Sequence, residues 1–131
     1  MNGIVIVDKP QEWTSQDVTA RLRRVFNTRR IGHGGTLDPM ATGVLPVFVG
    51  RATRGVEFFE HAEKAYETVI RLGLTTDTED VFGNTLTEQP VSLTEEAFLD
   101  VLPRFRGKIR QVPPMYSALK VNGQKLCDLA R

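Results

Sequence analysis

The chain has 131 residues, of which 40% are hydrophobic and 25% are charged, the composition of an ordinary soluble globular protein. This length allows one domain with a moderate core. A single cysteine, Cys127, excludes an internal disulfide and a cysteine-based zinc cluster. No apolar run approaches the roughly 20 residues that span a bilayer, and the apolar residues 4–7 are too few for a signal peptide. We therefore expect a cytoplasmic protein with no membrane partner.

The net charge of +1 hides an asymmetry along the sequence. Residues 1–56 contain eight Lys or Arg and four Asp or Glu, whereas residues 57–131 contain nine and twelve, so the two parts carry +4 and −3. The basic part includes Asp38, and we expect a basic rim around this acid that attracts phosphates. The alternative is that Arg21, Arg23 and Arg24 only form a solvated face of a helix.

The first half of the chain predicts two strands and two helices. In chain order we expect a buried strand over 3–8, a helix capped by Thr14 or Ser15 that ends near residue 26, a strand over 44–49 and a short helix over 52–62 that buries Val56, Phe58 and Phe59. Pro46 has no N–H to donate, so the strand over 44–49 should lie at a sheet edge or contain a bulge.

The second half predicts further mixed elements. We expect a strand over 66–74, an acidic turn-rich segment over 75–84, a helix from the Thr94 cap to about Leu102, a loop or edge segment over 104–114, a strand over 117–121 with a turn at Asn122-Gly123, and a helix from about Gln124 to Arg131. Strands and helices do not follow a strict βαβ alternation. This pattern indicates an α+β fold with a mixed, largely antiparallel sheet and flanking helices.

A loop of constrained shape carries an acid at Asp38. Gly34 and Gly35 permit backbone angles that side chains forbid, and Pro39 pushes Asp38 out of the helical region. Asp38 is thus presented on a loop just before a predicted strand, which is a common place for a catalytic group. The alternative is a turn in which Asp38 only caps backbone amides.

The segment from Arg30 to Val47, with Gly32-His33-Gly34-Gly35-Thr36-Leu37-Asp38-Pro39 at its centre, closely resembles the active-site segment of bacterial tRNA pseudouridine-55 synthases, the TruB family. Three more segments resemble family motifs in the same order: Gly3–Pro10 with Trp13-Thr14-Ser15, then Lys64-Ala65-Tyr66, then Arg106–Lys120. The resemblance covers the whole chain, and it implies the N-terminal portion of the pseudouridine synthase fold.

This resemblance implies isomerisation of uridine 55 to pseudouridine in the T-loop of tRNA. Uracil is detached from ribose, rotated and rejoined through carbon, a reaction for which the family needs no cofactor and no metal. Asp38 would be the catalytic carboxylate, acting as a nucleophile on the sugar or the base, or as a base that takes a proton.

The target base must leave its stack before the reaction. By resemblance, His33 helps to displace and hold the flipped region and Tyr66 stacks on the uracil, although each could instead be structural. Seven more residues are expected to shape the site around Asp38: Lys9, Pro10, Gly34, Gly35, Thr36, Leu37 and Pro39.

Other functions have weaker support in the sequence. Gly32–Leu37 begins like a dinucleotide-binding loop, but Leu37 occupies the place of the third glycine. Asp77, Glu79 and Asp80 offer oxygen ligands for a divalent ion, yet a solvated acidic turn explains them as well. The main rival is a non-catalytic RNA-binding module, or an inactive fragment, that keeps the fold.

The predicted last helix is still running at Arg131, so we expect residues 1–131 to be the N-terminal portion of a longer catalytic domain. A later Lys-Gly-Thr-Tyr-Ile-Arg-like segment of the family supplies a basic partner for the catalytic Asp, and a C-terminal RNA-binding domain usually follows. Both are absent here. We therefore expect Asp38 to lie in a partly buried pocket without its basic partner, and the segment alone to be inactive.

The half-built sheet should expose an edge that a second polypeptide, the rest of the protein or a neighbouring molecule covers. The resemblance also implies the T-arm stem-loop of tRNA as the partner and a monomer when complete.

Overall fold

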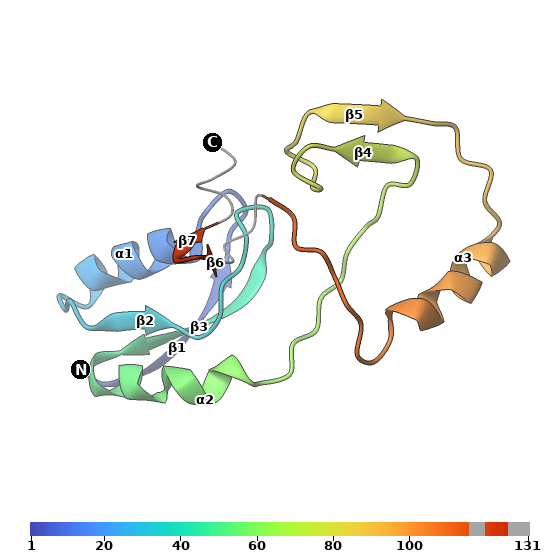
Figure 1. Ribbon diagram of the computed structural model, residues 1–131. Helices are drawn as coiled ribbons and strands as arrows, with labels where there is room; N and C mark the ends of the chain where they lie inside the picture. The colour runs from blue at the N-terminus through green and yellow to red at the C-terminus, as the bar shows by residue number, and fades with distance from the viewer. Residues whose placement is uncertain (116–119, 126–131) are drawn as a thin grey trace. The chain divides into compact units, whose positions relative to one another are not determined.

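The computed structural model describes residues 1–115 and 120–125 (Figure 1). The chain divides into two compact units, Met1–Tyr66 (unit 1) and Glu67–Arg131 (unit 2). The predicted strand over 117–121 and the predicted helix from about Gln124 to Arg131 lie partly outside the described residues, and Cys127 lies outside them. Within the described ranges, no helix combines the length and the apolar character that crossing a membrane requires.

Unit 1 is a three-stranded antiparallel sheet with helices packed against it (Figure 1). Its elements are β1 (Gly3–Lys9), α1 (Ser15–Val25), β2 (Ile31–His33), β3 (Gly43–Val49), the 3-10 helix η1 (Gly50–Gly55) and α2 (Val56–Glu60). The strand order is β1-β3-β2, so the two longest strands pair along their whole length. The predicted strands over 3–8 and 44–49 and the helix that ends near residue 26 are confirmed.

The prediction that Pro46 places its strand at an edge or in a bulge is wrong, because β3 is the central strand and pairs with β1 in continuous register. In an antiparallel ladder the N and O atoms of one residue point to the same side. The Pro46 carbonyl accepts a hydrogen bond from the Gly34 amide at 2.8 Å, on the β2 side. β2 pairs with β3 only from Val47 onward, so no ladder bond requires the missing Pro46 donor.

Of the two predicted caps, Thr14 and Ser15, the structure has Thr14, which starts α1 with a capping box. The Thr14 hydroxyl accepts from the Asp17 amide at 3.1 Å, and the Asp17 carboxylate accepts from the Thr14 amide at 2.8 Å. These bonds satisfy donors that the first helical turn leaves without intrahelical partners. The hydroxyl of Thr14 also donates to the Asp17 carboxylate and is the main cause that lowers the pKa of Asp17.

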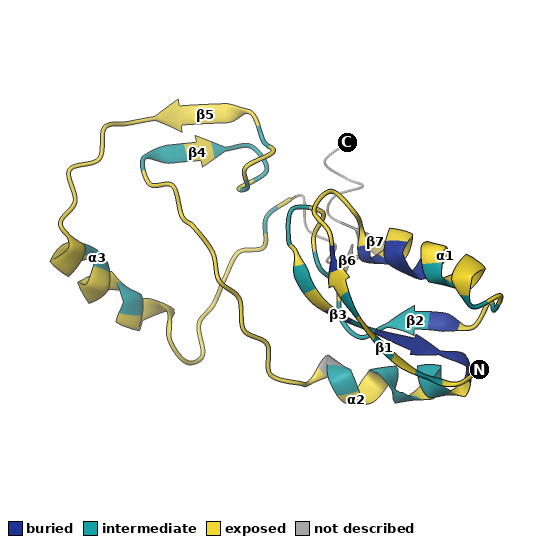
Figure 2. Ribbon diagram, turned by 180° about the vertical axis from the view of Figure 1, so that it is seen from behind, coloured by how far each residue is buried: buried dark blue, intermediate teal, exposed yellow. Residues whose placement is uncertain are grey.

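The core lies between α1 and one face of the sheet, where Figure 2 shows the dark blue of buried residues. Alternate residues of β3 share this face, and they pack with residues of α1, β2 and β1. The buried members are Val18, Ile31, Leu45, Val47 and Val49, with Val5, Val7, Leu22, Phe26 and Leu37 packed around them. Every residue that the structure describes as buried belongs to unit 1.

The other face of the sheet is only partly covered. Phe48 is buried there by an edge-to-face contact with Phe59 of α2, with ring centroids 5.0 Å apart. Ile4, Ile6 and Val44 on β1 and β3 are 50%, 63% and 70% exposed. The predicted burial of Phe58 is wrong, since its side chain is 77% exposed.

Unit 2 contains short elements and, in its described part, no buried residue. They are β4 (Leu74–Thr76), β5 (Thr85–Glu88), α3 (Glu95–Val101), the 3-10 helix η2 (Leu102–Phe105), β6 (Lys120–Val121) and β7 (Gln124–Lys125). The Thr94 cap is confirmed, because its hydroxyl accepts from the Ala97 amide at 3.2 Å. The turn at Asn122-Gly123 is also confirmed, between β6 and β7.

Three predictions for unit 2 are wrong. Of the predicted strand over 66–74, only its last residue, Leu74, belongs to a strand. Residues 63–71 are exposed and pair with no described strand. The partner of β4 is β5, a segment in which no strand was predicted, since all four of its residues are exposed. The segment that begins at Gln124 is strand β7, not the start of a helix. The fold class nevertheless holds: helices and antiparallel sheets combine in an α+β architecture.

Candidate active site

The loop that carries Asp38, residues 34–42, joins the end of β2 to the start of β3. At its first residue, the Gly34 amide bonds the Pro46 carbonyl, which extends the β2–β3 pairing by one bond. Further along, the Asp38 carbonyl accepts from the Ala41 amide at 3.0 Å and closes a turn. The loop therefore lies at the end of the sheet where β1 finishes and β3 begins.

Lys9 fastens this loop to the chain that leaves β1. Its side chain is fully buried, and its ammonium donates to the carbonyls of Trp13 at 2.6 Å, Pro10 at 3.0 Å and Pro39 at 3.4 Å. Within the described residues, no carboxylate lies at ion-pair distance from it. Three carbonyl oxygens thus solvate a buried cation and draw together residues 10, 13 and 39.

Ser15 forms a second tie between α1 and the loop. Its buried hydroxyl accepts from the Leu37 amide at 3.0 Å and donates to the Leu37 carbonyl at 3.2 Å. The Glu12 amide adds a backbone bond to the Pro39 carbonyl at 2.7 Å. Asp38 is therefore flanked on both sides by residues whose backbone is held from outside the loop.

Gly34 and Gly35 must each be glycine, but for different physical reasons. A Cβ at Gly34 would lie 2.9 Å from Cε2 of Phe48 and 3.3 Å from Cβ of Phe59, so the close approach of the loop to the Phe48 ring requires glycine. Gly35 has open space around it but a φ of +103°, a conformation that L side chains rarely adopt.

The Asp38 carboxylate itself is exposed and accepts no hydrogen bond from any described residue. The expectation of a partly buried pocket is wrong for this chain, because the loop turns outward after Leu37 packs on the core. The alternative in which Asp38 caps backbone amides requires a bond to its carboxylate that the described part of the chain does not contain. What results is an unpartnered carboxylate on a firmly held loop.

His33 and Tyr66 have different surroundings. His33 ends β2, half-buried, with Nδ1 hydrogen-bonded to the Gly35 carbonyl and Nε2 3.4 Å from Nε2 of Gln16. The ring is thus held beside the Asp38 loop. Tyr66 is 68% exposed, outside any helix or strand, and none of the described residues contacts it by a hydrogen bond or ring packing. The structure does not bring Tyr66 together with Asp38.

The other residues predicted to shape the site fall into two groups. Lys9, Gly34, Gly35, Leu37 and Pro39 make or require the contacts described above, and Pro10 supplies one carbonyl to Lys9. Thr36 is exposed, and no hydrogen bond of its side chain occurs in the described residues. Ser15 was predicted as a possible helix cap and as part of the motif Trp13-Thr14-Ser15, without a predicted bond to the Asp38 loop. The place of Ser15 in the motif Trp13-Thr14-Ser15 is the sequence feature that could have indicated its hydrogen bonds to the loop.

The predicted basic rim around Asp38 is wrong. Arg29 and Arg30 precede β2, and Arg51 follows β3 at its far end, so these bases lie at the opposite end of the strands from the loop. The acids of residues 1–56 lie at the Asp38 end instead, on β1, at the start of α1 and in the connecting loops: Asp8, Glu12, Asp17 and Asp38. Lys9 is the one base of residues 1–56 at that end, and it is buried.

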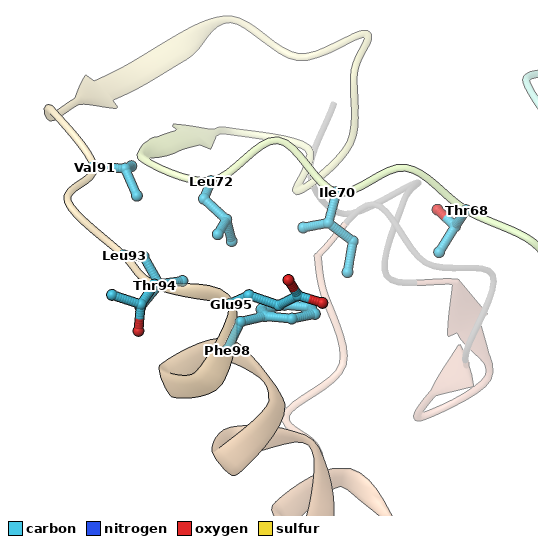
Figure 3. Close-up of a pocket in the computed structure, with 8 residues that line it drawn as sticks. All are labelled: Thr68, Ile70, Leu72, Val91, Leu93, Thr94, Glu95 and Phe98. Atoms are coloured by element: carbon cyan, nitrogen blue, oxygen red, sulfur yellow. The ribbon is translucent and has the colours of Figure 1, made fainter.

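Unit 2 contains a groove and an acidic turn, neither of which has the features of a catalytic or metal site. A groove of about 370 Å³ in unit 2 lies between residues 68–72, residues 91–93 and α3 (Figure 3). Its walls are mainly apolar, with Ile70, Leu72 and Phe98 directed toward it and Glu95 as its only ionisable side chain. Such a lining offers no paired acid and base for chemistry.

The acidic turn over 77–84 is held by its own hydrogen bonds. The Asp77 carboxylate accepts from the amide of Asn84 at 2.8 Å and from its side chain at 3.0 Å, and the side-chain bond is the main cause that lowers the Asp77 pKa. Asp80 accepts from Thr78 at 2.6 Å and from the Phe82 amide at 2.9 Å. No group of three His, Cys, Asp or Glu within residues 1–115 and 120–125 is placed to hold a metal ion.

In a comparison with known protein families, residues 23–131 match the N-terminal domain of the TruB family pseudouridylate synthases. The chain belongs to the TruB family. The resemblance of the Asp38 segment to this family is therefore confirmed, and the match includes most of the chain.

Curated relatives extend the TruB similarity to the whole sequence. The chain is 52% identical over 133 residues to tRNA pseudouridine synthase B of Lactococcus lactis subsp. lactis (strain IL1403), covering 100% of this chain and 40% of the relative. It is 50% identical over 131 residues to the protein of the same name from Stutzerimonas stutzeri (strain A1501), covering 100% and 43%. The chain thus spans less than half the length of these relatives.

Among solved structures, a chain in the crystal structure of a Cbf5-Nop10-Gar1 complex superimposes with a TM-score of 0.61 and 30% sequence identity. The match covers 90% of this chain and 31% of the other. It agrees with the N-terminal portion of the pseudouridine synthase fold that the sequence predicts.

Proposed function

We propose that residues 1–131 form the N-terminal portion of the catalytic domain of a tRNA pseudouridine synthase, which isomerises uridine 55 in the T-loop. The observation that carries this proposal is the Asp38 carboxylate, exposed and without a hydrogen-bond partner among the described residues, on a loop held by Lys9 and Ser15. Membership of the TruB family supports it, together with relatives that are named tRNA pseudouridine synthase B.

In the reaction that we propose, the bond between N1 of uracil and C1′ of ribose breaks and a bond between C5 and C1′ forms. The proton on C5 is lost to solvent, and N1 gains one, so the product is an isomer. The Asp38 carboxylate acts on the sugar or the base as a nucleophile, or removes a proton as a base. A carboxylate with free lone pairs at the surface is available for either role, whereas a capping carboxylate is not.

The test of Asp38 is the isosteric substitution Asp38→Asn in the full-length protein. It retains the loop geometry and removes the charge, and we expect turnover to fall by about 10² to 10⁴-fold, the usual contribution of a positioned acid or base. Tritium release from tRNA labelled at C5 of uridine measures this. Activity of the variant within tenfold of the wild type would remove Asp38 from the mechanism.

We further propose that the target uridine flips out of its stack, with Tyr66 stacked on the uracil and His33 holding the displaced region. An aromatic platform contributes roughly 1–3 kcal/mol per stacked base, which offsets the unstacking cost of a few kcal/mol. Tyr66→Phe should keep turnover and Tyr66→Leu should lose it; equal turnover of the two variants contradicts the platform.

For His33, a 2-aminopurine beside the target reports flipping by its fluorescence. The ring of His33 is anchored to the Gly35 carbonyl, so it is fixed relative to the Asp38 loop. His33→Ala should reduce the fluorescence increase that binding produces in the wild type. An unchanged increase contradicts the role of His33.

We also propose that this segment requires the rest of the catalytic domain for activity. Two features support this: the exposed apolar side chains of Ile4, Ile6 and Val44 on one sheet face, and a unit 2 without buried residues in its described part. The segment is assayed alone and mixed with the separately expressed remainder, its length taken from the relatives. We expect turnover only in the mixture; multiple turnover by residues 1–131 alone contradicts the proposal.

The complete protein is proposed to be a cytoplasmic monomer that binds the T-arm stem-loop of tRNA and uses no cofactor or metal. An isolated T-arm hairpin should compete with whole tRNA, light scattering should give the mass of one chain, and dialysis against EDTA should leave turnover unchanged. The rival function is a non-catalytic RNA-binding module. RNA binding by the full-length protein without pseudouridine formation in a T-loop RNA would favour that rival.

A further inference from the structure

Most charges of residues 1–56 are separated along the direction of the strands of unit 1. At one end lie Arg23 and Arg24 in the last turn of α1, Arg29 and Arg30 before β2, and Arg51 after β3; we call these five residues the arginine end. At the other end lie the acids of the Asp38 end, given above. β3 has seven residues, and at about 3.4 Å per residue roughly 20 Å separates the two ends.

The arginine end is held together by backbone contacts. The Gly50 amide donates to the Arg30 carbonyl at 2.7 Å, which places Arg51 beside the start of β2. The Arg51 amide donates to Oδ1 of Asn2 at 2.6 Å, which fixes the chain as it leaves β3. The side chains of Arg30 and Arg51 therefore extend from backbone that hydrogen bonds hold in place.

All five side chains are exposed, and within the described residues none of their guanidinium groups lies at ion-pair distance from a carboxylate. Arg23 and Arg24 also complement the dipole of α1 at its C-terminus, but this accounts for only two of the five. The other three lie in the connection between α1 and β2 and in η1. Unpaired guanidinium groups suit phosphate, which they bind through two parallel N–H bonds.

We propose that the arginine end binds the sugar-phosphate backbone of the RNA substrate and thereby orients it on unit 1. This inference rests on the proposed function, which makes RNA the substrate. The acid end repels phosphates, so the phosphates of nucleotides remote from the target uridine are favoured at the arginine end, about 20 Å from Asp38. Phosphate contacts position an RNA and carry no sequence information. The arginine end is thus a positioning surface, remote from the reacting atoms.

The test uses the full-length protein and a fluorescent RNA stem-loop with a uridine in its loop. The single variants Arg23→Gln, Arg24→Gln and Arg30→Gln remove one charge each, and the triple variant removes three. Arg104→Gln is the matched control, because it removes the same charge from an exposed residue of unit 2. Affinity is measured between about 50 and 200 mM salt, where counterion release dominates.

We expect each single variant to weaken RNA binding several-fold and to lower the slope of log K against log salt by about one. Since the surface only positions the RNA, KM should rise while kcat stays within about twofold. Arg24→Lys keeps the charge and should restore most of the salt slope. The Arg104→Gln control should match the wild type in all these measurements.

Three results overturn the inference: variants that bind RNA like the Arg104→Gln control, variants whose kcat falls at constant KM, or a wild type that does not bind RNA. A loss of binding to phosphatidylserine vesicles with unchanged RNA affinity would also overturn it and assign the arginine end to an anionic lipid surface. The proposed function fails separately if the wild type binds the stem-loop but forms no pseudouridine. In that case the salt dependence of RNA binding by the variants still decides the role of the arginine end.

Discussion

Ser15 and Leu37 are joined by two hydrogen bonds through one hydroxyl group, which accepts from the Leu37 amide at 3.0 Å and donates to the Leu37 carbonyl at 3.2 Å. This pair connects the first residue of α1 to the residue before Asp38. Because Leu37 also packs on the core, its backbone is fixed from two sides. The position of the Asp38 carboxylate therefore depends on a helix that begins 22 residues before Leu37.

Replacing Ser15 with alanine should loosen the Asp38 loop. The change removes both bonds to Leu37 and leaves partly buried backbone groups unsatisfied, so we expect the free energy of unfolding to fall by about 1–3 kcal/mol. Urea unfolding measures the fall, and hydrogen exchange of the Leu37 amide should accelerate. The exposed Ser92→Ala variant is the control. Equal Leu37 exchange rates in Ser15→Ala and wild type would show that the bond has no such role.

Replacing Lys9 with methionine should separate the Asp38 loop from the chain after β1. Methionine fills a similar volume but donates nothing to the carbonyls of Trp13, Pro10 and Pro39. We expect a loss of about 1–3 kcal/mol in unfolding free energy, with NMR shift changes concentrated in residues 10–13 and 38–40. Lys108→Met, at an exposed position, should have no effect. If the NMR chemical shifts of residues 10–13 and 38–40 in Lys9→Met equal those of the wild type, Lys9 does not hold the loop to the chain after β1.

Gly34→Ala should destabilise unit 1 by crowding Phe48. The added Cβ would lie 2.9 Å from the ring of Phe48, and overpacking of this kind typically costs about 1–3 kcal/mol. Gly3→Ala is the matched control, because nothing lies within 4 Å of its Cβ position. A double-mutant cycle with Phe48→Leu measures the coupling. Additive effects of the two substitutions would show that the ring is not the cause.

Asp17 should make stability depend on pH. Its pKa is lowered in the folded state, mainly by the Thr14 hydroxyl, so the folded state favours the charged carboxylate. The stabilisation is fully present above the unfolded value of 3.8 and is lost as the pH falls through the lower folded value. Asp17→Asn keeps an acceptor for Thr14 without the charge. The wild type should be more stable than the variant at pH 7, and this difference should shrink below about pH 4.

Urea unfolding of wild type and Asp17→Asn at both pH values measures that difference. Glu63→Gln, which changes an exposed carboxylate outside the helices, serves as the control. A difference that stays constant from neutral to acidic pH is the contrary outcome.

Local rules predicted the parts of the fold whose causes are local. The Thr14 cap of α1, the Thr94 cap of α3 and the turn at Asn122-Gly123 each depend on residues within four positions, and all three are confirmed. The apolar run over 44–49 predicted a strand but not its central place in the sheet, because the side that the Pro46 nitrogen faces is set by strand pairing.

The site was predicted as a set of residues but not as an arrangement. The resemblance identified Asp38 and its neighbours, whereas the ties from Lys9 and Ser15 run to carbonyl and amide groups that every residue carries, so no side-chain pattern indicates them. The charge asymmetry of residues 1–56 was visible in the sequence. Its direction was not, because only the antiparallel pairing places Arg30 and Asp38 at opposite ends of the sheet.

The complete burial of Lys9 makes this residue a natural reporter for chemical footprinting. Amine-reactive acylating reagents modify accessible lysines such as Lys108, but they cannot reach an ammonium that is enclosed by three carbonyls. The extent of acylation at Lys9 therefore measures how often the Asp38 loop detaches. Peptide mass spectrometry can measure the acylation of Lys9 without an introduced label. The measurement works in cell extracts as well as with purified protein, before and after RNA is added.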